Sequence, residues 1–409
     1  MSTHRQAAMP FILIAVLIDM ISIGVMVPVL PHIVGSFTKT NDEQTLAFLA
    51  VTLAFGLANF ISSPVLGALS DRFGRRPVLL IGFAGMAMSF FVTAVASALW
   101  MLVVVRLFSG AMQSNIAVAN AYVADITEAQ DRAKRFGQLG AMFGIGFILG
   151  PVIGGVLGDI NVRYPFFLAG SLAVVNWCYG FFVLPESLPV HRRRSFDWRR
   201  ANPVASLHGL TVLKGVGPLV WVLALSALAQ FMLHTSWVLY TKFKFGWGPG
   251  QVGWSLFAVG VVSAISQGLL LKPLLARFSA QQLAVTGLLV GACSYLGFGL
   301  VTQGWMMYAV IAFGLIGSTA SAAMQSIISN AADASRQGQT MGAVSSLNSL
   351  MAVFAPVLAL ELLRWVSHRP PGDGLIGLPF YTCAALQLTA AVIALAVFRR
   401  RAPALVKPA

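Results

Sequence analysis

The chain has 409 residues, of which 57% are hydrophobic and 10% charged, and its mean hydropathy is +0.81. About a quarter of the residues in an average soluble domain are charged, so this composition excludes a soluble globular protein and indicates a polytopic membrane protein. A net charge of +14 would suggest nucleic-acid binding in a soluble protein, but here the informative feature is which loops carry the positive residues.

Apolar segments of roughly 20 residues, each long enough to cross about 30 Å of hydrocarbon, recur along the whole chain. They predict twelve transmembrane helices, near 8–34, 45–69, 77–97, 99–122, 136–158, 164–184, 217–240, 250–271, 281–301, 304–328, 338–363 and 378–398. A barrel would show short alternating segments instead, so the expected fold class is an all-α membrane protein. The first segment is too long for a signal peptide and lacks a small-residue cleavage pattern, so we expect a retained helix.

The first apolar segment carries one acid, Asp19, in an otherwise uncharged run from Phe11 to Pro31. A charge at this depth is costly, and it usually faces a cavity and carries function. Burial favours the neutral acid and a nearby cation favours the carboxylate, so an acid between these two influences can load and release a proton. The alternative is an acid permanently paired with Arg106 that serves packing alone.

The loop after the second segment reads Gly67-Ala-Leu-Ser-Asp-Arg-Phe-Gly-Arg-Arg76. Gly67 would permit a close approach between helices and Gly74 a tight turn, while the arginines would hold the loop in the cytosol. A positive turn with one neutralising acid is the simpler interpretation. The full pattern G-x-L-x-D-R-x-G-R-R, however, resembles the signature loop of the major facilitator superfamily. The candidate gate-loop residues are Gly67, Asp71, Arg72, Gly74, Arg75 and Arg76.

The resemblance covers essentially the whole chain and implies twelve helices in two pseudo-symmetric six-helix bundles. It also implies that Asp71 meets cationic groups and a helix N-terminus across the two halves and latches the outward-open state. A carboxylate at such a position stabilises the contact by about 0.3–1 kcal/mol, which biases a two-state equilibrium without determining it. The matching loop of the second half, Gly268 to Phe278, contains no acid, so only the first loop is expected to latch strongly.

Residues 17–31 resemble the first-helix motif of the tetracycline-efflux-like branch, and so do the segments 184–200 and 336–339. True tetracycline exporters have a carboxylate in their third helix, whereas the matching stretch of this chain has Ser89. The ninth segment also lacks an acid. These departures weaken the case for a metal-chelated, positively charged cargo and favour a neutral or weakly charged amphipathic molecule.

In the fourth segment, Arg106, Gln113 and Asn120 are spaced by seven residues, which places them on one stripe of a continuous helix. A polar stripe in lipid must face protein or water. Arg106 stays protonated, and its position resembles the fourth-helix arginine of drug exporters. Gln113 and Asn120 are substrate-cavity candidates, although a bond to a neighbouring helix is the simpler role for Asn120.

The fifth segment carries glycines at a spacing of four, together with a proline that would bend the helix. Such small residues let transmembrane helices approach at backbone distance, so ordinary packing explains part of the pattern. The string GPVIGG also resembles the motif of drug-exporting antiporters. The residues of this glycine seam are Gly146, Gly150, Pro151, Gly154, Gly155 and Gly158.

The longest polar stretch separates two groups of six segments and contains HRRRSFDWRR at 191–200. We therefore expect an N-terminal bundle at 1–185, a basic cytoplasmic linker at 186–216 and a C-terminal bundle at 217–409. The basic run is expected to set topology and contact anionic lipid rather than bind nucleic acid. Three pairs at one separation predict duplicated halves: Arg72 with Arg277, Gly137 with Gly342, and Pro151 with Pro356.

The second half offers weaker cavity candidates. Gln230, His234 and Trp237 would share one face of the seventh helix, where His234 could titrate or simply bond to a neighbour. Gln325 and Asn348 are further candidates, with interhelical bonding as the alternative. Glu361 and Arg364 are three residues apart and are expected to form a local pair.

Most of the 27 Lys and Arg residues fall in connections that would share one side of the membrane. Since positive loops stay inside, we expect both termini in the cytoplasm of a bacterial-type inner membrane. The three cysteines lie in separate apolar segments without paired spacing, so neither a disulfide, a metal site nor a cofactor is expected.

Together these features predict a proton-coupled antiporter that exports a small amphipathic drug or antibiotic by alternating access. Asp19 would be the proton site, Arg106 would tune it, and the protein would act as a monomer. The alternative within transport is a proton-coupled importer or metabolite exporter of the same fold. An intramembrane enzyme would need a nucleophile or metal cluster that the sequence does not supply, and a receptor would not need the deep charges.

Overall fold

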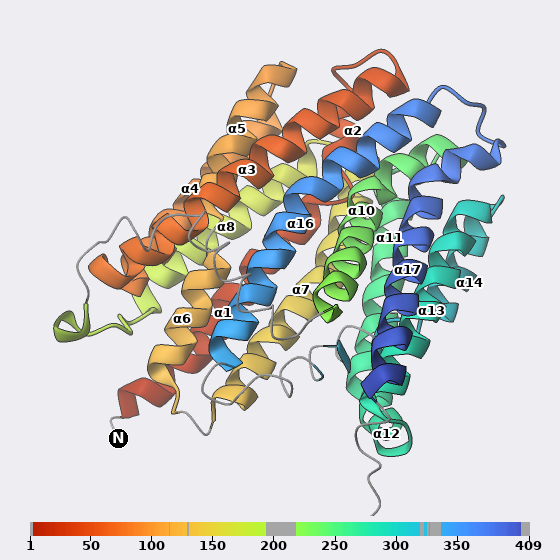
Figure 1. Ribbon diagram of the computed structural model, residues 1–409. Coiled ribbons are helices and arrows are strands. Elements are labelled where there is room, and N and C mark those ends of the chain that lie inside the picture. Colours follow the sequence, from red (N-terminus) through yellow and green to blue (C-terminus); the bar gives the residue numbers. More distant parts are fainter. Residues whose placement is uncertain are drawn as a thin grey trace, which may run out of the picture. The chain divides into compact units, whose positions relative to one another are not determined.

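The computed structural model describes residues 3–113, 115–128, 131–193, 218–319, 323–324, 327 and 337–401. Within these ranges every regular element is a helix, so the predicted all-α fold is confirmed (Figure 1). The described chain forms two compact units. The first comprises the described residues up to 193 together with Trp247–Phe257, and the second comprises 218–246 and 258–401.

In the first unit, α1 packs against α7 and α8, α3 packs against α5, and α4 packs against α8. Its core is apolar and includes the fully buried side chains of Ile12, Leu79 and Tyr122. The helices are α1 (Thr3–Met26), α2 (Leu30–Gly35), α3 (Asn41–Phe73), α4 (Arg75–Val95), α5 (Leu99–Met112), α6 (Asn115–Ile126), α7 (Arg132–Ile160), α8 (Tyr164–Val183) and the short η1 (Val190–Arg192).

In the second unit, α10 packs against α16 and α17, and α13 packs against α17. A π-helical segment, η3, interrupts one long helix between its first part, α11, and its last part, α12. The helices here are α10 (Leu219–Phe245), α11 (Pro249–Ile265, which begins in the first unit), η3 (Ser266–Leu270), α12 (Leu271–Arg277), α13 (Ala280–Leu300), α14 (Gly304–Phe313), α16 (Gln337–Val366), η4 (Gly374–Gly377) and α17 (Leu378–Arg401).

The described residues contain ten helical stretches that are long and apolar enough to cross a membrane. Two further apolar helices, Leu99–Met112 and Gly304–Phe313, are shorter. The first reflects a break in the segment expected at 99–122, because α5 ends at Met112 and α6 begins at Asn115. The second belongs to the segment expected at 304–328, part of which lies outside the described residues. Twelve spans therefore remain a prediction.

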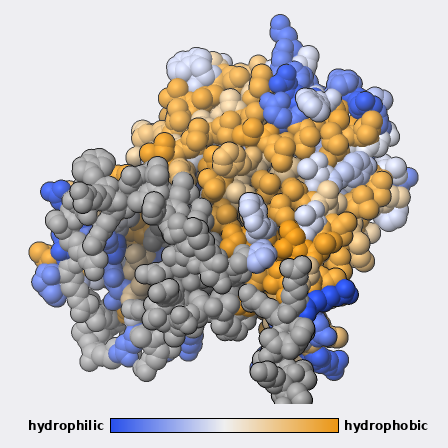
Figure 2. Space-filling model, in the orientation of Figure 1, coloured by the Kyte–Doolittle hydropathy of each residue, from blue (hydrophilic) through white to orange (hydrophobic). Residues whose placement is uncertain are grey.

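The surface of the described chain has the character of a membrane protein. On the face drawn in Figure 2, hydrophobic residues cover most of the described surface. Large apolar side chains are open, with Phe182 at 80%, Trp365 at 70% and Leu269 at 69% exposure. Such exposure would be unfavourable in water and is expected against lipid. Most of the predicted basic linker, from Arg194 onward, lies outside the described residues.

Candidate functional site

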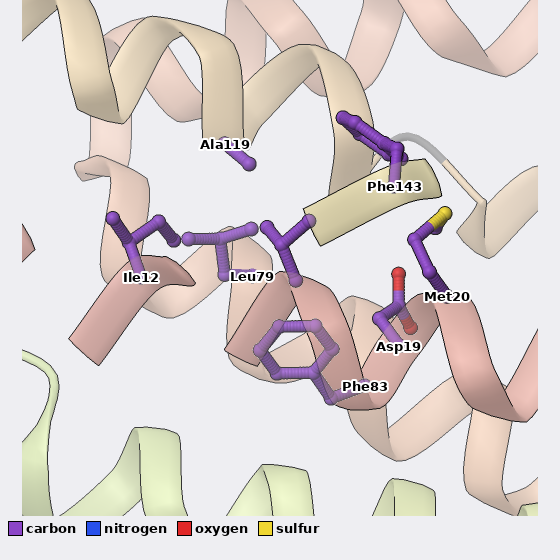
Figure 3. A pocket seen from close by; sticks show the side chains of 8 residues that line it. Ile12, Asp19, Met20, Leu79, Phe83, Ala119 and Phe143 are labelled. Carbon is purple, nitrogen blue, oxygen red and sulfur yellow. The ribbon is translucent and has the colours of Figure 1, made fainter. Parts of the chain in front are cut away.

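Asp19 lies on α1 and lines a small cavity inside the first unit. Its side chain is buried, with 5% exposure for the residue. The cavity has a volume of about 10 Å³, on the order of one water molecule, and its other walls are apolar (Figure 3). The lining residues come from α1, α4, α6 and α7: Ile12, Val16, Met20, Leu79, Phe83, Ala119 and Phe143. Among the residues that line this cavity, Asp19 carries the one polar side chain.

Arg106, the other deep ionisable group of the first unit, lies on α5 and is 9% exposed. Its guanidinium carbon is 4.4 Å from the centre of the Phe55 ring, and one terminal nitrogen donates to the Met26 sulfur at 3.2 Å. Its Nε has no hydrogen-bond partner in the described chain. Met26 is seven residues beyond Asp19 on α1, about 10 Å along the helix, so the two deep charges act at different levels of one helix bundle.

The expected polar stripe from Arg106 through Gln113 to Asn120 is wrong in its geometry. It assumed one continuous helix, but Gln113 follows the last residue of α5, and Asn120 lies on the separate helix α6. Both side chains are half-buried. Across the break between α5 and α6, the spacing of seven residues no longer places Asn120 on the helix face that carries Arg106.

The gate loop between α3 and α4 is organised by Arg75, which is 8% exposed. Its guanidinium donates to the Asp125 carboxylate of α6 at 3.1 Å, to Asp71 at 2.6 Å and to the Ser70 hydroxyl at 2.6 Å. Three elements are thus joined by one cation. The sequence singled out Asp71 and Arg75 but missed Asp125, whose only signal is its place at the end of an apolar segment.

Gly74 is required in this loop for two reasons. Its φ of 107° lies in the region that favours glycine. A Cβ there would also run into the Glu186 carboxylate, which accepts hydrogen bonds from the backbone N–H of Arg75 at 2.8 Å and of Leu188 at 3.0 Å. Glu186 therefore ties the chain after α8 to the start of α4, a role that the sequence did not reveal.

The remaining gate-loop residues have simpler surroundings. Arg76 donates to the Phe181 carbonyl and lies over that ring, whereas Arg72 lies over the adjacent Phe73 ring. At Gly67 a Cβ would meet no described atom within 4 Å, so the close approach expected there is absent from this conformation. Asp71 pairs within its own loop, and its latch to a second helix stays a prediction.

The glycine seam of α7 faces α1 at backbone distance. A Cβ at Gly150 would lie 2.7 Å from the Gly24 Cα, and one at Gly154 would run into the Val25 carbonyl. A Cβ at Gly146 would lie 2.5 Å from the Cβ of Met20, which is next to the acid on the same helix. Pro151 is buried within α7, while Gly155 and Gly158 approach Pro249. The seam therefore fixes the helix that carries Asp19.

A family model described as Major Facilitator Superfamily matches residues 12–356 and 219–409 of the chain. The chain belongs to the major facilitator superfamily. It is 34% identical to the class C tetracycline resistance protein of Escherichia coli, with 87% of this chain and 89% of that protein covered. It is 33% identical to the class D tetracycline resistance protein of Salmonella ordonez, with 90% and 93% covered.

Solved structures of superfamily transporters share this fold. The human organic anion transporter MFSD10 has a TM-score of 0.66 at 20% sequence identity, covering 96% of this chain and 100% of that one. A bacterial homologue of the human lysosomal transporter Spinster has a TM-score of 0.75 at 13% identity, covering 100% of both. These likenesses extend over nearly the whole of each chain, so they show the fold of the entire chain rather than of one part of it.

The substrate-cavity candidates of the second unit differ in their exposure. Gln230 and His234 are exposed on α10, whereas Trp237 is 3% exposed and packs edge-on against Phe298 at 5.0 Å. The three positions share one continuous helix, but Trp237 is packed in the core, whereas Gln230 and His234 are exposed. Asn348 is half-buried on α16, and Gln325 lies outside the described residues. The expected local pair is confirmed, with Arg364 donating to Glu361 at 3.2 Å.

Lys244 was expected in a loop, but it lies in the last turn of α10 and is 6% exposed. Its ammonium donates to the Gly299 carbonyl at 2.6 Å and to the Tyr240 hydroxyl at 3.0 Å. A backbone oxygen and a hydroxyl rather than acids thus solvate this cation. No sequence pattern reveals such a site, because carbonyl groups are present at every residue.

Proposed function

We propose that this protein is a proton-coupled antiporter that exports a small amphipathic compound, a drug or antibiotic, by alternating access. The observation that carries the proposal is the Asp19 carboxyl group in an apolar cavity on the first helix of a superfamily transporter. The tetracycline resistance proteins to which the chain is similar support export as the direction of transport.

Asp19 supplies the proton-binding group. In the closed cavity, desolvation favours the neutral acid, so a proton is retained there. When the cavity opens to water, the carboxylate is hydrated and the proton can leave. Arg106 keeps a permanent positive charge near Met26, about two helical turns along α1 from Asp19, and this charge favours release of the proton. Proton movement is coupled to export if the transporter binds either the proton or the cargo, and not both at once.

The gate loop sets how readily the conformations interchange. Arg75 holds Asp71 and Asp125 together in the described conformation. In the outward-open state Asp71 exchanges this partner for the second-half helix that the superfamily motif implies. The contact is a bias of about one kcal/mol or less, as expected for a carboxylate at a helix end.

The cargo is neutral or weakly charged. At the third-helix position where tetracycline exporters carry an acid, Ser89 is buried and its hydroxyl donates to the Met86 carbonyl of its own helix. The helix Ala280–Leu300 contains no acid either. With one deep acid and one deep arginine, the first unit has no excess negative charge to hold a cation. Gln113, Asn120, Gln230, His234, Gln325 and Asn348 remain the polar candidates for the cavity.

The organisation that accompanies this function is a pair of bundles, 1–185 and 217–409, joined by a basic linker at 186–216. Both termini lie in the cytoplasm of a bacterial-type inner membrane, since most positive loops fall on that side. The transporter acts as a monomer and not as an enzyme, with protons, the cargo and the lipid bilayer as its partners.

The test is transport by Asp19→Asn in inside-out vesicles energised with a pH gradient. We expect accumulation of a fluorescent amphipathic dye or an antibiotic to fall at least about tenfold, because the amide cannot carry the proton. Glu361→Gln, which alters a half-buried acid paired with Arg364, is the control and should transport normally. Thermal shifts induced by the cargo should persist in both variants.

Gradient-dependent accumulation by Asp19→Asn would remove this residue from the coupling role. Proton-driven uptake in right-side-out vesicles would replace export with import. A metabolite exporter would respond to metabolites but not to drugs in the same vesicles.

A further inference from the structure

Two side chains hold the segment Trp247–Gly250, which connects α10 to α11. The chain leaves α10 at Gly246 in a left-handed conformation with φ 68°. Trp247 is then 6% exposed, so the segment is packed rather than looped into solvent. Residues Trp247–Phe257 belong to the first compact unit, although the chain before and after them belongs to the second. Whatever holds this segment therefore fastens the start of α11 to the first unit.

Asp159 at the end of α7 makes the first of these contacts. Its Oδ1 accepts a hydrogen bond from the backbone N–H of Gly250 at 2.9 Å, in the first turn of α11. A carboxylate at this position meets unsatisfied N–H groups and the positive end of the helix. A Cβ at Gly250 would run into the Asp159 carboxylate, and one at Gly248 would lie 3.2 Å from Oδ1. The glycines thus leave room for this acid.

His32 in α2 makes the second contact. Its Nδ1 is 3.0 Å from the Pro28 carbonyl oxygen, and its Nε2 is 3.4 Å from the Trp247 carbonyl oxygen. Both oxygens can only accept, whereas a neutral imidazole carries one N–H and an imidazolium two. Only the protonated ring can donate to both carbonyls. The contact with Trp247 is therefore strongest at low pH.

Charged groups of the first unit occur on the chain around His32. Asp42 and Glu43 are in the first turn of α3, which packs on α2, and Lys39 precedes that helix. Asp159, in α7, contacts the same segment as His32. Histidine is the side chain whose charge changes between about pH 5 and 8, so it is the group here that can respond to physiological pH.

The packing between these contacts is bare backbone. A Cβ at Gly155 of α7 would lie 2.6 Å from the Pro249 carbonyl oxygen and 3.1 Å from the Cα atoms of Gly250 and Gly253. Glycines on both sides of this contact carry no side chains that could interlock, so the two backbones can separate there without rotamer changes. The two polar contacts then decide how firmly the start of α11 is held.

We propose that His32 and Asp159 form a clamp on Trp247–Gly250 that holds the start of α11 in one conformation of the transport cycle and releases it in the other. Protonation of His32 tightens the clamp. Both are positioning residues, since they act on a backbone segment and not on the cargo. The proposal rests on the proposed function, because only an alternating-access cycle requires the release.

Hydrogen–deuterium exchange of the purified full-length protein in lipid nanodiscs tests the clamp without transport. We expect peptides covering 247–253 to exchange roughly two- to fivefold faster in Asp159→Ala than in the wild type. Asp159→Asn keeps an acceptor oxygen and should fall between the two. Glu361→Ala removes a half-buried acid of α16 that pairs with Arg364, and this control should leave these peptides unchanged.

The pH arm separates His32 from a purely structural residue. After correction for intrinsic exchange, wild-type protection of 247–253 should rise as the pH falls from about 8 to about 5, the range in which histidine titrates. His32→Gln, which retains a single amide group, should abolish this rise, whereas the exposed control His368→Gln should keep it. If a variant is unstable by thermal unfolding, Asp159→Asn and the wild-type pH series still decide the question.

Equal exchange in Asp159→Ala and the wild type would overturn the clamp, and so would a pH response that survives in His32→Gln. These results are independent of transport. A clamp supported by exchange in a protein that moves no cargo would contradict the proposed function and leave the clamp standing. Normal proton-coupled transport, together with unchanged exchange in Asp159→Ala, would support the proposed function and contradict the clamp.

Discussion

The helix pair α1–α7 of the first unit and the pair α10–α16 of the second carry different small residues at equivalent positions, glycine in the first pair and alanine in the second. In the first pair, Gly150 and Gly154 of α7 meet the backbone of α1. Pro151 and Pro356 correspond in the two halves, so the equivalent positions in α16 are Ala355 and Ala359. Both alanines are fully buried, in a cluster with Ala229 and Met232 of α10.

This difference coincides with a difference in chemistry. The first pair carries Asp19, whereas the cluster between α10 and α16 is apolar. Backbones in direct contact cannot slide or repack as methyl groups can, so they hold α1 in one register. We infer that the glycines serve the placement of the acid, and that the alanines serve ordinary packing.

The largest effect is expected from Gly154→Ala. Its Cβ would run into the Val25 carbonyl, and a backbone atom cannot turn aside, so α1 and α7 must separate. We expect a loss of about 3 kcal/mol of stability, measured as thermal unfolding in detergent. Gly144→Ala is the matched control, because a Cβ there meets nothing within 4 Å, and it should be neutral or slightly stabilising. Similar stabilities for the two variants would contradict the conclusion that the glycine contacts between α7 and α1 hold these helices together.

A smaller effect is expected from Ala359→Gly in the second pair. The change removes one buried methyl group and introduces a glycine into a helix, which together cost about 1–2 kcal/mol. Transport per folded molecule should stay normal, because the residue lies in a cluster of apolar side chains. A loss of proton coupling in this variant, at unchanged stability, would show that the second pair also positions functional groups.

The smallest effect concerns Asp373, in the loop that follows α16. Hydrogen bonds from the Leu375 N–H and from Arg369 lower the pKa of this carboxyl below its ordinary value of 3.8. A lowered pKa in the folded state stabilises the fold above the unfolded value, and the contribution is lost as the pH falls through the folded value. The Asp373→Asn variant should therefore unfold about 1 °C lower or less at about pH 6. The difference should shrink as the pH falls below the ordinary value of 3.8, and a difference that grows in acid would contradict this assignment.

Much of the fold followed from the sequence, because the length and apolarity of a membrane helix leave few alternatives. The seam of α7 is an example, since a glycine at every fourth residue of a transmembrane helix allows a second helix to approach at backbone distance. The buried setting of Asp19 was predictable for the same reason. The glycine of the gate loop, Gly74, was also predictable, since the turn after α3 needs a positive φ.

Other features could not be read from the sequence. The stripe from Arg106 to Asn120 failed because a helix break carries no mark in an apolar run. Asp125 and Glu186 were missed since their partner, Arg75, is far away along the chain. Lys244 was misplaced because its partners are a backbone carbonyl and a tyrosine hydroxyl, which have no recognisable spacing. Non-local polar contacts are thus where sequence patterns give least information.

The π-helical segment Ser266–Leu270 is a place where the chain can tolerate the deletion of one residue. A wide turn accommodates one residue more than an α-helical turn, and the chain on either side keeps its orientation. Deleting one codon inside the segment would convert it to regular helix and leave the flanking faces where they are. The same deletion within α10 or α13 would rotate every later residue of that helix by about 100°. This short stretch is therefore where the second half can lose a residue at little cost.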